Sequence, residues 1–341
     1  MQRLVFQKKS LIEWQEAPDP KINGKNQAIV KPIAIARCDL DLPIIHSKTL
    51  FRPPFAIGHE FIAEIVEVSE DMQNVFPLGT KVAVSFQVSC GDCLMCSSGI
   101  SNSCETVPLT SGFGMPPGAN HFGGALADLV HIPYASQMLL KVPQGIDPIS
   151  IASLSDNISE VWKLAGKYLP RIKSGNALVV GGEASSIGLY TALFLHQTKQ
   201  VSVLYMDTDR SRIDFAESLG IPVAWSDKFP KSAGRFNLVC DASASIEGWN
   251  LATRSLAAHA ILTSASIFWT NKLSILYLEF YNIGVEVQIG RVDSKESMPE
   301  ILKYIESGEF TPGRIVTQTA DFANAKEAWM EPSIKLVVTN N

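Results

Sequence analysis

Short apolar runs, separated by polar turns that contain glycine and proline, occupy the first half of the chain. The clearest runs are rich in Val, Ile and Ala and span residues 27–36, 61–68 and 81–86. Turn residues such as Pro53-Pro54 and Gly123-Gly124 lie between them. Up to about residue 150, this pattern predicts a mostly β domain built from short strands.

The pattern changes near Ile151, from which a helix is expected to extend to Leu169. It leads into Asn176-Ala-Leu-Val-Val, an uninterrupted apolar run of the kind buried on both faces of a parallel sheet. Strands and helices are then expected to alternate, with strands at 177–180, 201–206, 238–241, 260–264 and 285–289 and helices after Ser186, Asp209 and Ser245 and near Leu273. This succession predicts an α/β fold with a doubly wound parallel sheet.

Residues 291–341 return to a mixed pattern and are expected to pack back onto the first half of the chain. The elements predicted here are a helix near 298–307, a strand near 314–317, a helix from 321 and a strand at 335–338. The predicted domains are therefore 1–150 and 151–290, with 291–341 as a C-terminal segment that returns to the first domain.

Composition narrows the possible functions. The 341 residues are 46% apolar and 18% charged, which indicates a soluble globular chain of about two domains and excludes a disordered one. A net charge of -5 and a pI near 5.7 argue against nucleic acid or an anionic membrane as partners. The N-terminus lacks the features of a secretory signal, and the most apolar stretch, 177–195, is interrupted by Gly181, Gly182 and Glu183. We therefore expect a cytoplasmic protein.

Four of the six cysteines lie close together, in the pattern Cys90-x-x-Cys93-x-x-Cys96-x7-Cys104. This spacing lets four thiolates converge on one metal ion, and a reducing compartment favours metal over disulfides. Zinc is the favoured ion, and because four thiolates fill its tetrahedral shell, the site would be structural. An iron–sulfur centre and four ordinary cysteines are the alternatives.

Cys38, His59 with its neighbour Glu60, and Asp156 form a second candidate set. Sulfur, imidazole and carboxylate are all zinc ligands, and three protein ligands leave a fourth position open for catalysis. Each residue also has an ordinary explanation, because a lone Cys is usually a core residue and Asp156 could cap the helix that follows it.

A glycine turn after an apolar strand, Val179-Val-Gly-Gly-Glu-Ala-Ser-Ser-Ile-Gly188, is the third candidate. A helix that begins here could hold a pyrophosphate on its N-terminal amides, although the match to GxGxxG is imperfect. Asp207, at the end of the next strand, is placed to bind an adenosine ribose, which favours NAD over NADP. A doubly wound sheet that binds nothing, with Asp207 as a helix cap, is the alternative.

These motifs, in this order, resemble the zinc-containing alcohol dehydrogenases of the medium-chain dehydrogenase/reductase family over essentially the whole chain. The resemblance implies a GroES-like catalytic domain with a structural zinc lobe at 90–104, a Rossmann domain, and a dimer or tetramer. It assigns Cys38, His59 and Asp156 to a catalytic zinc, places Glu60 beside the metal, makes Asp41 the residue that orients His59, and places Phe86 in the substrate pocket. The implied cofactor-binding residues are Gly181, Gly182, Ser186, Ile187, Gly188, Asp207 and Arg212.

The chain departs from the family pattern at three positions. Leu40 stands where the family commonly has a Ser or Thr that passes on the alcohol proton, and a leucine cannot carry a proton. Asp39 and Glu183 stand where neutral or basic groups are common, so their charges would weaken binding of a dinucleotide.

The function that these residues predict is hydride transfer between an alcohol, or an aldehyde or ketone in reverse, and NAD, with two zinc ions per chain. A non-enzymatic zinc protein used for interaction or redox sensing is one alternative. A carbonyl or quinone reductase without catalytic zinc is the other. The sequence does not specify the substrate, the direction of the reaction, or whether the chain forms dimers or tetramers.

Overall fold

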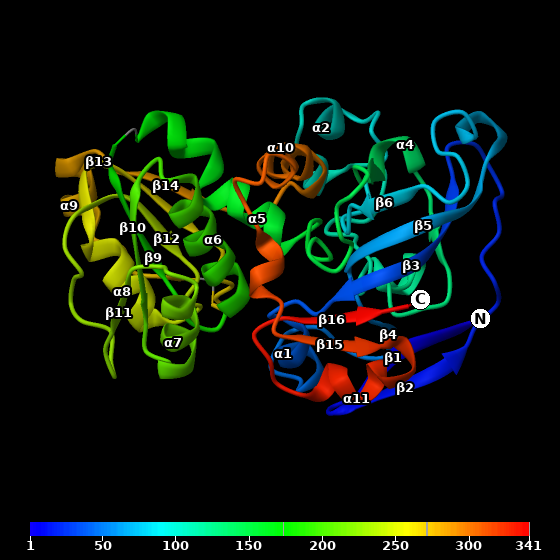
Figure 1. The fold of residues 1–341 in the computed structure, drawn as a ribbon, viewed down its shortest axis with the longest axis horizontal. Helices are drawn as coiled ribbons and strands as arrows, with labels where there is room; N and C mark the ends of the chain where they lie inside the picture. Colours follow the sequence, from blue (N-terminus) through cyan, green and yellow to red (C-terminus); the bar gives the residue numbers. More distant parts are fainter. Residues whose placement is uncertain (173, 271, 341) are drawn as a thin grey trace. The chain divides into compact units, whose positions relative to one another are not determined.

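The computed structural model describes residues 1–172, 174–270 and 272–340, which form two compact units (Figure 1). The first unit consists of Met1–Ser159, Val292–Glu306 and the chain from Val316 onward. The second unit consists of Glu160–Arg291 and Ser307–Ile315. The first unit thus extends beyond the expected boundary at residue 150, and a short part of the C-terminal segment belongs to the second unit.

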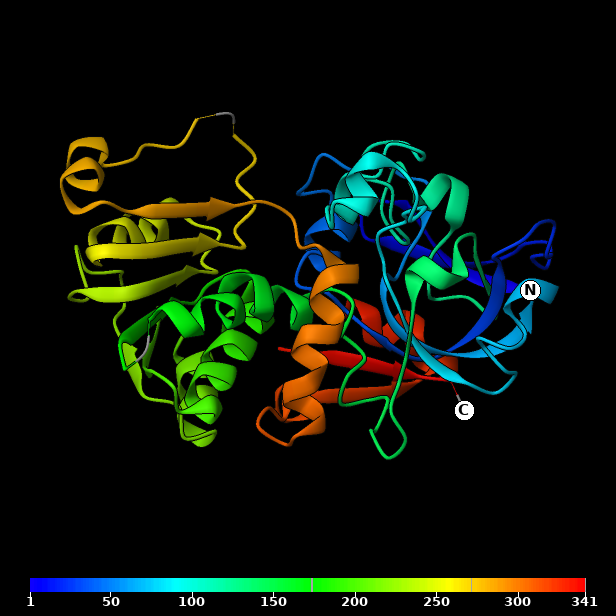
Figure 2. The same ribbon diagram turned by 90° about the horizontal axis from the view of Figure 1, so that it is seen from above.

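Two β-sheets form the framework of the first unit. A seven-stranded sheet has the order β15-β16-β3-β5-β6-β8, with β7 also paired to β3, and a three-stranded sheet has the order β2-β1-β4. The strands are β1 (Gln2–Lys8), β2 (Leu11–Glu16), β3 (Ala28–Ala36), β4 (Phe55–Ala56), β5 (Glu60–Val68), β6 (Lys81–Val84), β7 (Val130–Ile132), β8 (Leu139–Lys141), β15 (Gln318–Asp321) and β16 (Leu336–Thr339). The C-terminal β16 pairs antiparallel with β3, so the red end of the chain lies beside a blue strand in Figure 2.

Apolar side chains from both sheets share one core in this unit. Phe61 and Phe113 are fully buried and meet edge to face, with ring centroids 5.8 Å apart, and Trp329 contributes from the C-terminal segment. The helices of the unit are α1 (Asp41–Ile45), η1 (Glu70–Met72), α2 (Leu94–Ser97), η2 (Ser101–Ser103), α3 (Ala119–Phe122), α4 (Ala135–Met138), α10 (Ser294–Glu306), η5 (Phe322–Asn324) and α11 (Ala325–Met330).

The second unit is a six-stranded, all-parallel sheet with the order β11-β10-β9-β12-β13-β14. Its strands are β9 (Asn176–Val180), β10 (Ser202–Asp207), β11 (Val223–Trp225), β12 (Phe236–Asp241), β13 (Leu256–Ser264) and β14 (Glu286–Ile289). Its helices are α6 (Ser185–Thr198), α7 (Arg210–Ser218), α8 (Ile246–Arg254) and α9 (Tyr277–Ile283), together with η3 (Gly166–Arg171) and η4 (Pro312–Ile315).

Helices α6 and α7 cover one face of this sheet and α8 and α9 cover the other (Figure 1). The chain runs outward from β9 through β10 to β11, then returns to β12 on the other side of β9. The strand order therefore reverses beside β9, and in open α/β sheets ligands bind at that point, beyond the carboxyl ends of the strands. The expected doubly wound α/β fold class is confirmed.

Several elements differ from the sequence prediction. The helix expected at 151–169 is shorter, because residues 150–156 form turns; α5 spans Asn157–Leu164 and η3 follows it. The strand expected at 314–317 is wrong: Pro312 opens the 3₁₀ helix η4, and the strand β15 begins only at Gln318. The helix near Leu273 begins at Tyr277, and the hairpin of β1 and β2 had not been anticipated. Across the described ranges, every helix is too short or too polar to cross a bilayer.

Candidate active site and metal centres

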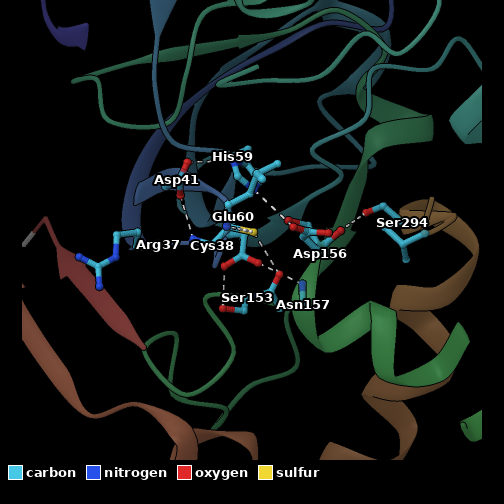
Figure 3. Close-up of polar contacts among 12 residues, drawn as sticks. Arg37, Cys38, Asp41, His59, Glu60, Ser153, Asp156, Asn157 and Ser294 are labelled. Atoms are coloured by element: carbon cyan, nitrogen blue, oxygen red, sulfur yellow. Dashed lines mark hydrogen bonds and ion pairs between the residues drawn. The ribbon is translucent and has the colours of Figure 1, made fainter. Parts of the chain in front are cut away.

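Cys38, His59, Glu60 and Asp156 converge in the first unit (Figure 3). Each offers one ligand atom, and these atoms all lie within 4.8 Å of one another. The pairing of two strands explains this, because Ala36 at the end of β3 is opposite Glu60 at the start of β5. Cys38 therefore comes just after the end of β3, and His59 comes just before the start of β5. Asp156 comes just before α5. The structure thus brings together the four side chains of the second candidate set.

The backbone conformation at position 58, directly before His59, requires a glycine. Its φ is +90°, in the region that L-residues rarely adopt, and a Cβ atom there would lie 3.0 Å from the backbone nitrogen of Leu126. The carbonyl of Gly58 also accepts a hydrogen bond from the backbone N–H of Ala125 at 2.8 Å. The backbone that positions His59 is therefore fixed by a close approach that only glycine permits.

His59 lies between two carboxylates. Its Nε2 is 3.3 Å from Asp156 Oδ2, and its Nδ1 is 3.7 Å from Asp41 Oδ1. Burial lowers the pKa of His59, but the charges of Asp41 and Asp156 outweigh it and raise the pKa to about 9. Among the described residues, Nδ1 is a buried nitrogen without a hydrogen-bond partner. Asp41 is held beside it because the Cys38 N–H donates to Asp41 Oδ2 at 2.8 Å.

The donor set fits a zinc ion. Burial, followed by the charges of Asp156 and Glu60, raises the pKa of the Cys38 thiol well above its ordinary value. The Cys38 thiolate and the carboxylates of Glu60 and Asp156 face one small volume and repel each other when all are ionised, and a divalent cation would remove that repulsion. Imidazole, thiolate and carboxylate are also the ligand types that zinc prefers. The side chains present therefore suit the metal that the sequence predicts.

Glu60 is held by residues that the sequence reasoning had missed. Its Oε2 accepts hydrogen bonds from Lys335 Nζ at 2.7 Å and Ser153 Oγ at 2.9 Å, and its Oε1 accepts from the Asn157 N–H at 3.0 Å. Burial raises the pKa of Glu60 to about 7, against the opposing effect of Lys335. Lys335 is fully buried and 275 positions from Glu60, so the only local signal was a lysine at the start of an apolar strand.

Other predicted residues lie around this cluster. The ring of Phe86 is 5.5 Å from the His59 ring, between centroids, and Phe86 is buried. Leu40 and Asp39 are half-buried, and the Leu40 N–H donates to Cys38 Sγ at 3.5 Å. The Cys38 thiol donates to Asn157 Oδ1 at 3.4 Å, which adds Asn157 to the residues that contact the cluster.

Cys90, Cys93, Cys96 and Cys104 form the second group, and their sulfur atoms lie within 4.8 Å of one another. All four are free thiols, with Cys90 and Cys96 sulfurs 4.0 Å apart and Cys93 and Cys104 sulfurs 3.9 Å apart. A tetrahedral zinc with Zn–S distances of about 2.3 Å requires sulfurs about 3.8 Å apart. The lobe therefore has the dimensions of a Cys₄ zinc site.

Hydrogen bonds to sulfur support thiolates in this lobe. Thr106 Oγ1 donates to Cys90 Sγ at 3.1 Å, and the Glu105 N–H donates to Cys93 Sγ at 3.4 Å. The bond from Glu105, with others, lowers the pKa of Cys93 to about 6. Donors that point at sulfur favour the deprotonated ligand that a metal requires.

The glycine loop of the second unit lies at the switch point after β9. A Cβ on Gly182 would be 2.3 Å from the carbonyl oxygen of Ser243, so the close packing of this loop requires glycine. Gly188, Ser186 and Ile187 are buried in the first turns of α6. Glu183 is exposed, and its N–H donates to the Ser243 carbonyl at 3.0 Å. The loop has the expected position, and its acidic side chain faces solvent.

Asp207 ends β10, as expected, but its carboxylate does not face solvent. The residue is fully buried, and Arg212 binds both of its oxygens, with Nε to Oδ2 at 2.7 Å and Nη2 to Oδ1 at 2.9 Å. Tyr205 Oη donates to Oδ2 at 2.7 Å, and the Asp209 N–H donates to Oδ1 at 2.9 Å. The carboxylate that the sequence places against a ribose is thus bound by four protein donors.

Comparisons with known proteins agree with these features. Residues 24–144 match the family model described as the alcohol dehydrogenase GroES-like domain. Zinc-type alcohol dehydrogenase B from Aspergillus flavus is 29% identical over 224 residues, which is 64% of this chain and 50% of that protein. The chain thus spans about half the length of this curated relative.

Two solved structures have a similar fold. Alcohol dehydrogenase TADH from Thermus sp. ATN1 is 21% identical, and the match covers 100% of both chains with a TM-score of 0.87. An alcohol dehydrogenase from Escherichia coli CFT073, solved in complex with NADH, is 21% identical, with a TM-score of 0.81 and 99% of each chain covered. At these identities, the two structures show the fold alone and not a particular substrate.

Proposed function

Because the chain belongs to the zinc-containing alcohol dehydrogenases of the medium-chain dehydrogenase/reductase family, we propose that it transfers hydride between an alcohol and a nicotinamide dinucleotide. The observation that carries this proposal is the convergence of Cys38, His59 and Asp156 beside Glu60, with ligand atoms within 4.8 Å. Three ligands of these types leave one zinc position for a substrate oxygen.

Each side chain of the cluster has a distinct part in this proposal. Cys38 and Asp156 would be the anionic ligands that balance the charge of the metal, and His59 Nε2 would be the neutral one. When bound, zinc supplies a Lewis acid that lowers the pKa of an alcohol, and the nicotinamide supplies the hydride acceptor. Asp41 would orient the His59 ring through Nδ1. Phe86, beside that ring, would give the substrate an apolar wall.

The proton of the alcohol needs a route out of the site. Leu40 cannot provide it, because its side chain has neither a donor nor an acceptor. Glu60 is bound by Lys335, Ser153 and the Asn157 N–H, so its oxygens are committed to structural contacts. The proposed route therefore runs through water or through a hydroxyl of the cofactor or substrate.

The catalytic assignment is tested by Asp156→Ala, with Asp227→Ala, an exposed aspartate of the second unit, as the control. We expect the purified wild type to hold two zinc ions per chain and Asp156→Ala to hold one, measured by atomic emission. Dehydrogenase activity, followed by nicotinamide absorbance over short alcohols, polyols, amino alcohols and aldehydes, should fall at least about 100-fold. Asp227→Ala should match the wild type in both measurements.

The same measurements separate the alternatives. One zinc per wild-type chain without activity would favour a non-enzymatic zinc protein, while activity with one zinc would favour a reductase without catalytic zinc. Full activity in Asp156→Ala, or loss of both metals, would contradict the assignment. Of the two dinucleotides, NAD is the one that the sequence favours, through Asp207. A cytoplasmic location also stays a prediction.

We further propose that the chain assembles as a homodimer or homotetramer. Strand β14 is the last strand of the parallel sheet (Figure 2). Two of its apolar side chains, Val287 and Ile289, are exposed. Edge strands with apolar side chains pair readily with another chain. A two-fold axis beside β14 would continue the sheet into a second copy.

A further inference from the structure

The adenosine end of the cofactor site has a feature that the proposed function does not use. In a doubly wound fold, the ribose lies beside the carboxyl end of the strand next to the glycine loop. That strand is β10, and it ends at Asp207. An acidic side chain there binds the ribose hydroxyls of NAD and repels the 2′-phosphate of NADP, whereas an arginine accommodates that phosphate. We call the carboxyl end of β10 the adenosine corner. The charge that is exposed at this corner therefore decides which dinucleotide binds.

Asp207 is buried beneath the glycine loop, and Tyr205 keeps it there. Tyr205 and Asp207 lie two residues apart in β10, so they share a face of the sheet. A Cβ on Gly181 would be 2.3 Å from Tyr205 Oη and 2.5 Å from Asp207 Oδ2, which places both groups directly against Gly181. Both side chains are fully buried. To reach a ribose, Asp207 would have to break the bond with Tyr205 and expose a charge.

Arg212 is the member of this cluster that solvent reaches. Its side chain is 18% exposed, while that of Asp207 is 0% exposed. The two hydrogen bonds to Asp207 use two of the five guanidinium N–H groups, so donors remain for a second anion. A ligand at this corner meets the cation first, with the carboxylate behind it.

Three charged side chains lie close to this corner, and the charges of Arg212, Asp207 and Asp209 sum to −1. Arg212 neutralises Asp207, and Asp209, 3.5 Å from Arg212 Nη1, accepts the N–H groups of Ser211 and Arg212 as the N-cap of α7. The charge that opposes a 2′-phosphate is therefore that of Asp209 alone, and the N-terminal amides of α7, which Asp209 caps, partly offset it.

We propose that Arg212, positioned by Asp207 and Tyr205, is the residue that determines cofactor specificity and that it lets the chain accept NADP as readily as NAD. This inference rests on the dinucleotide site of the proposed function and not on the zinc chemistry. It replaces the NAD preference that Asp207 predicts from sequence, because the preference requires a carboxylate that faces the ribose.

The test uses the two adenosine halves of the cofactors, so it does not depend on activity. Binding of 5′-AMP and of adenosine 2′,5′-bisphosphate to the purified zinc-loaded protein is measured by calorimetry at low and physiological salt. We expect the wild type to bind the two nucleotides with Kd values within about tenfold of each other, a difference of ~1.4 kcal/mol. Arg212→Gln should weaken the bisphosphate at least about tenfold and leave 5′-AMP within about threefold.

Two further variants protect this test against simple misfolding. Arg212→Gln leaves a buried carboxylate without its counter-ion and could lower stability. Asp207→Asn keeps the shape, removes the negative charge and should shift the affinity ratio the other way, towards the bisphosphate. Arg210→Gln is the matched control, because Arg210 is exposed on the same helix, pairs with Asp214 and should change neither affinity.

The outcomes separate this inference from the proposed function. A wild type that binds 5′-AMP more than tenfold tighter than the bisphosphate would overturn the inference alone. Equal weakening of both nucleotides by Arg212→Gln would do the same, because it indicates a structural role. Binding of neither nucleotide would overturn both the inference and the cofactor part of the proposed function.

Discussion

Lys335 illustrates how one buried charge can arrange a site that it does not enter. Its ammonium group donates to Glu60 Oε2 at 2.7 Å and to the Arg37 carbonyl at 3.0 Å, with no exposed surface on either side chain of the pair. A buried carboxylate without a partner is costly, so the lysine fixes where Glu60 can be. Glu60 is thereby held beside the proposed metal position by contacts with the protein, which leaves Cys38, His59 and Asp156 as the proposed ligands.

His131 gives a prediction about pH. Its ring is half-buried, with Nε2 3.1 Å from the neutral Gln27 Oε1, and burial lowers the pKa of His131 from its ordinary 6.5. Below pH 6.5 the unfolded chain therefore binds more protons than the folded chain. This contribution to stability is complete above pH 6.5 and is lost as the pH falls through the folded-state pKa. We expect the urea midpoint to fall less between pH 7 and pH 5 in His131→Gln than in the wild type. Equal slopes would contradict this.

The four-cysteine lobe is an element whose stability depends on its own ligands. Its helices α2 and η2 have only four and three residues, too few to be stable alone. Two hydrogen bonds fasten η2 to another segment of the first unit: Ser101 Oγ donates to Glu296 Oε2 of α10 at 2.7 Å, and Asn102 Nδ2 donates to the Val292 carbonyl at 3.3 Å. A metal that joins Cys90, Cys93, Cys96 and Cys104 would supply the missing cross-link.

Replacing one ligand of the lobe should therefore affect stability before activity. We expect Cys104→Ser to hold one zinc per chain, to unfold roughly 5–15 °C below the wild type, and to keep most of its kcat/KM at temperatures where it is folded. Cys240→Ser is the control, because Cys240 is also buried but lies in β12 of the second unit and belongs to neither cluster. Loss of activity in folded Cys104→Ser would mean that the lobe takes part in catalysis.

At the scale of elements, the sequence predicted those features that depend on the spacing of nearby residues. The cysteine spacing and the strand–helix alternation need no knowledge of distant contacts, and both agree with the structure. The bounds near Pro312 were wrong because a 3₁₀ turn and a strand start look alike in a short apolar run. The burial of Asp207 did have a signal, since Tyr205 two residues earlier must share its face. The contact of Lys335 with Glu60 had none, because it depends on strands far apart in the chain.

Exposed apolar surface is concentrated at one end of the second unit. Large apolar side chains that are at least 40% exposed gather along the segment that carries α9 and β14 and include Ile267, Trp269, Ile275, Tyr277, Leu278, Tyr281, Val287 and Ile289. A monomer rarely exposes so many in one stretch. Glu286 of β14 is already paired with Arg171 at 2.6 Å, so this edge carries little uncompensated charge. These features suit a second copy of the chain, whose edge would be identical.

We therefore expect the protein to sediment as a dimer or tetramer at micromolar concentration. The double variant Val287→Lys with Ile289→Lys should shift it to smaller species, because two lysines on each edge strand would repel across a two-fold axis. Leu50→Lys with Leu78→Lys is the matched control: these leucines of the first unit are 68% and 67% exposed, and the pair adds the same charge elsewhere. A monomeric wild type, or an assembly that the edge variant leaves intact, would show that β14 is not the interface. In that case the apolar segment would have to be covered in another way.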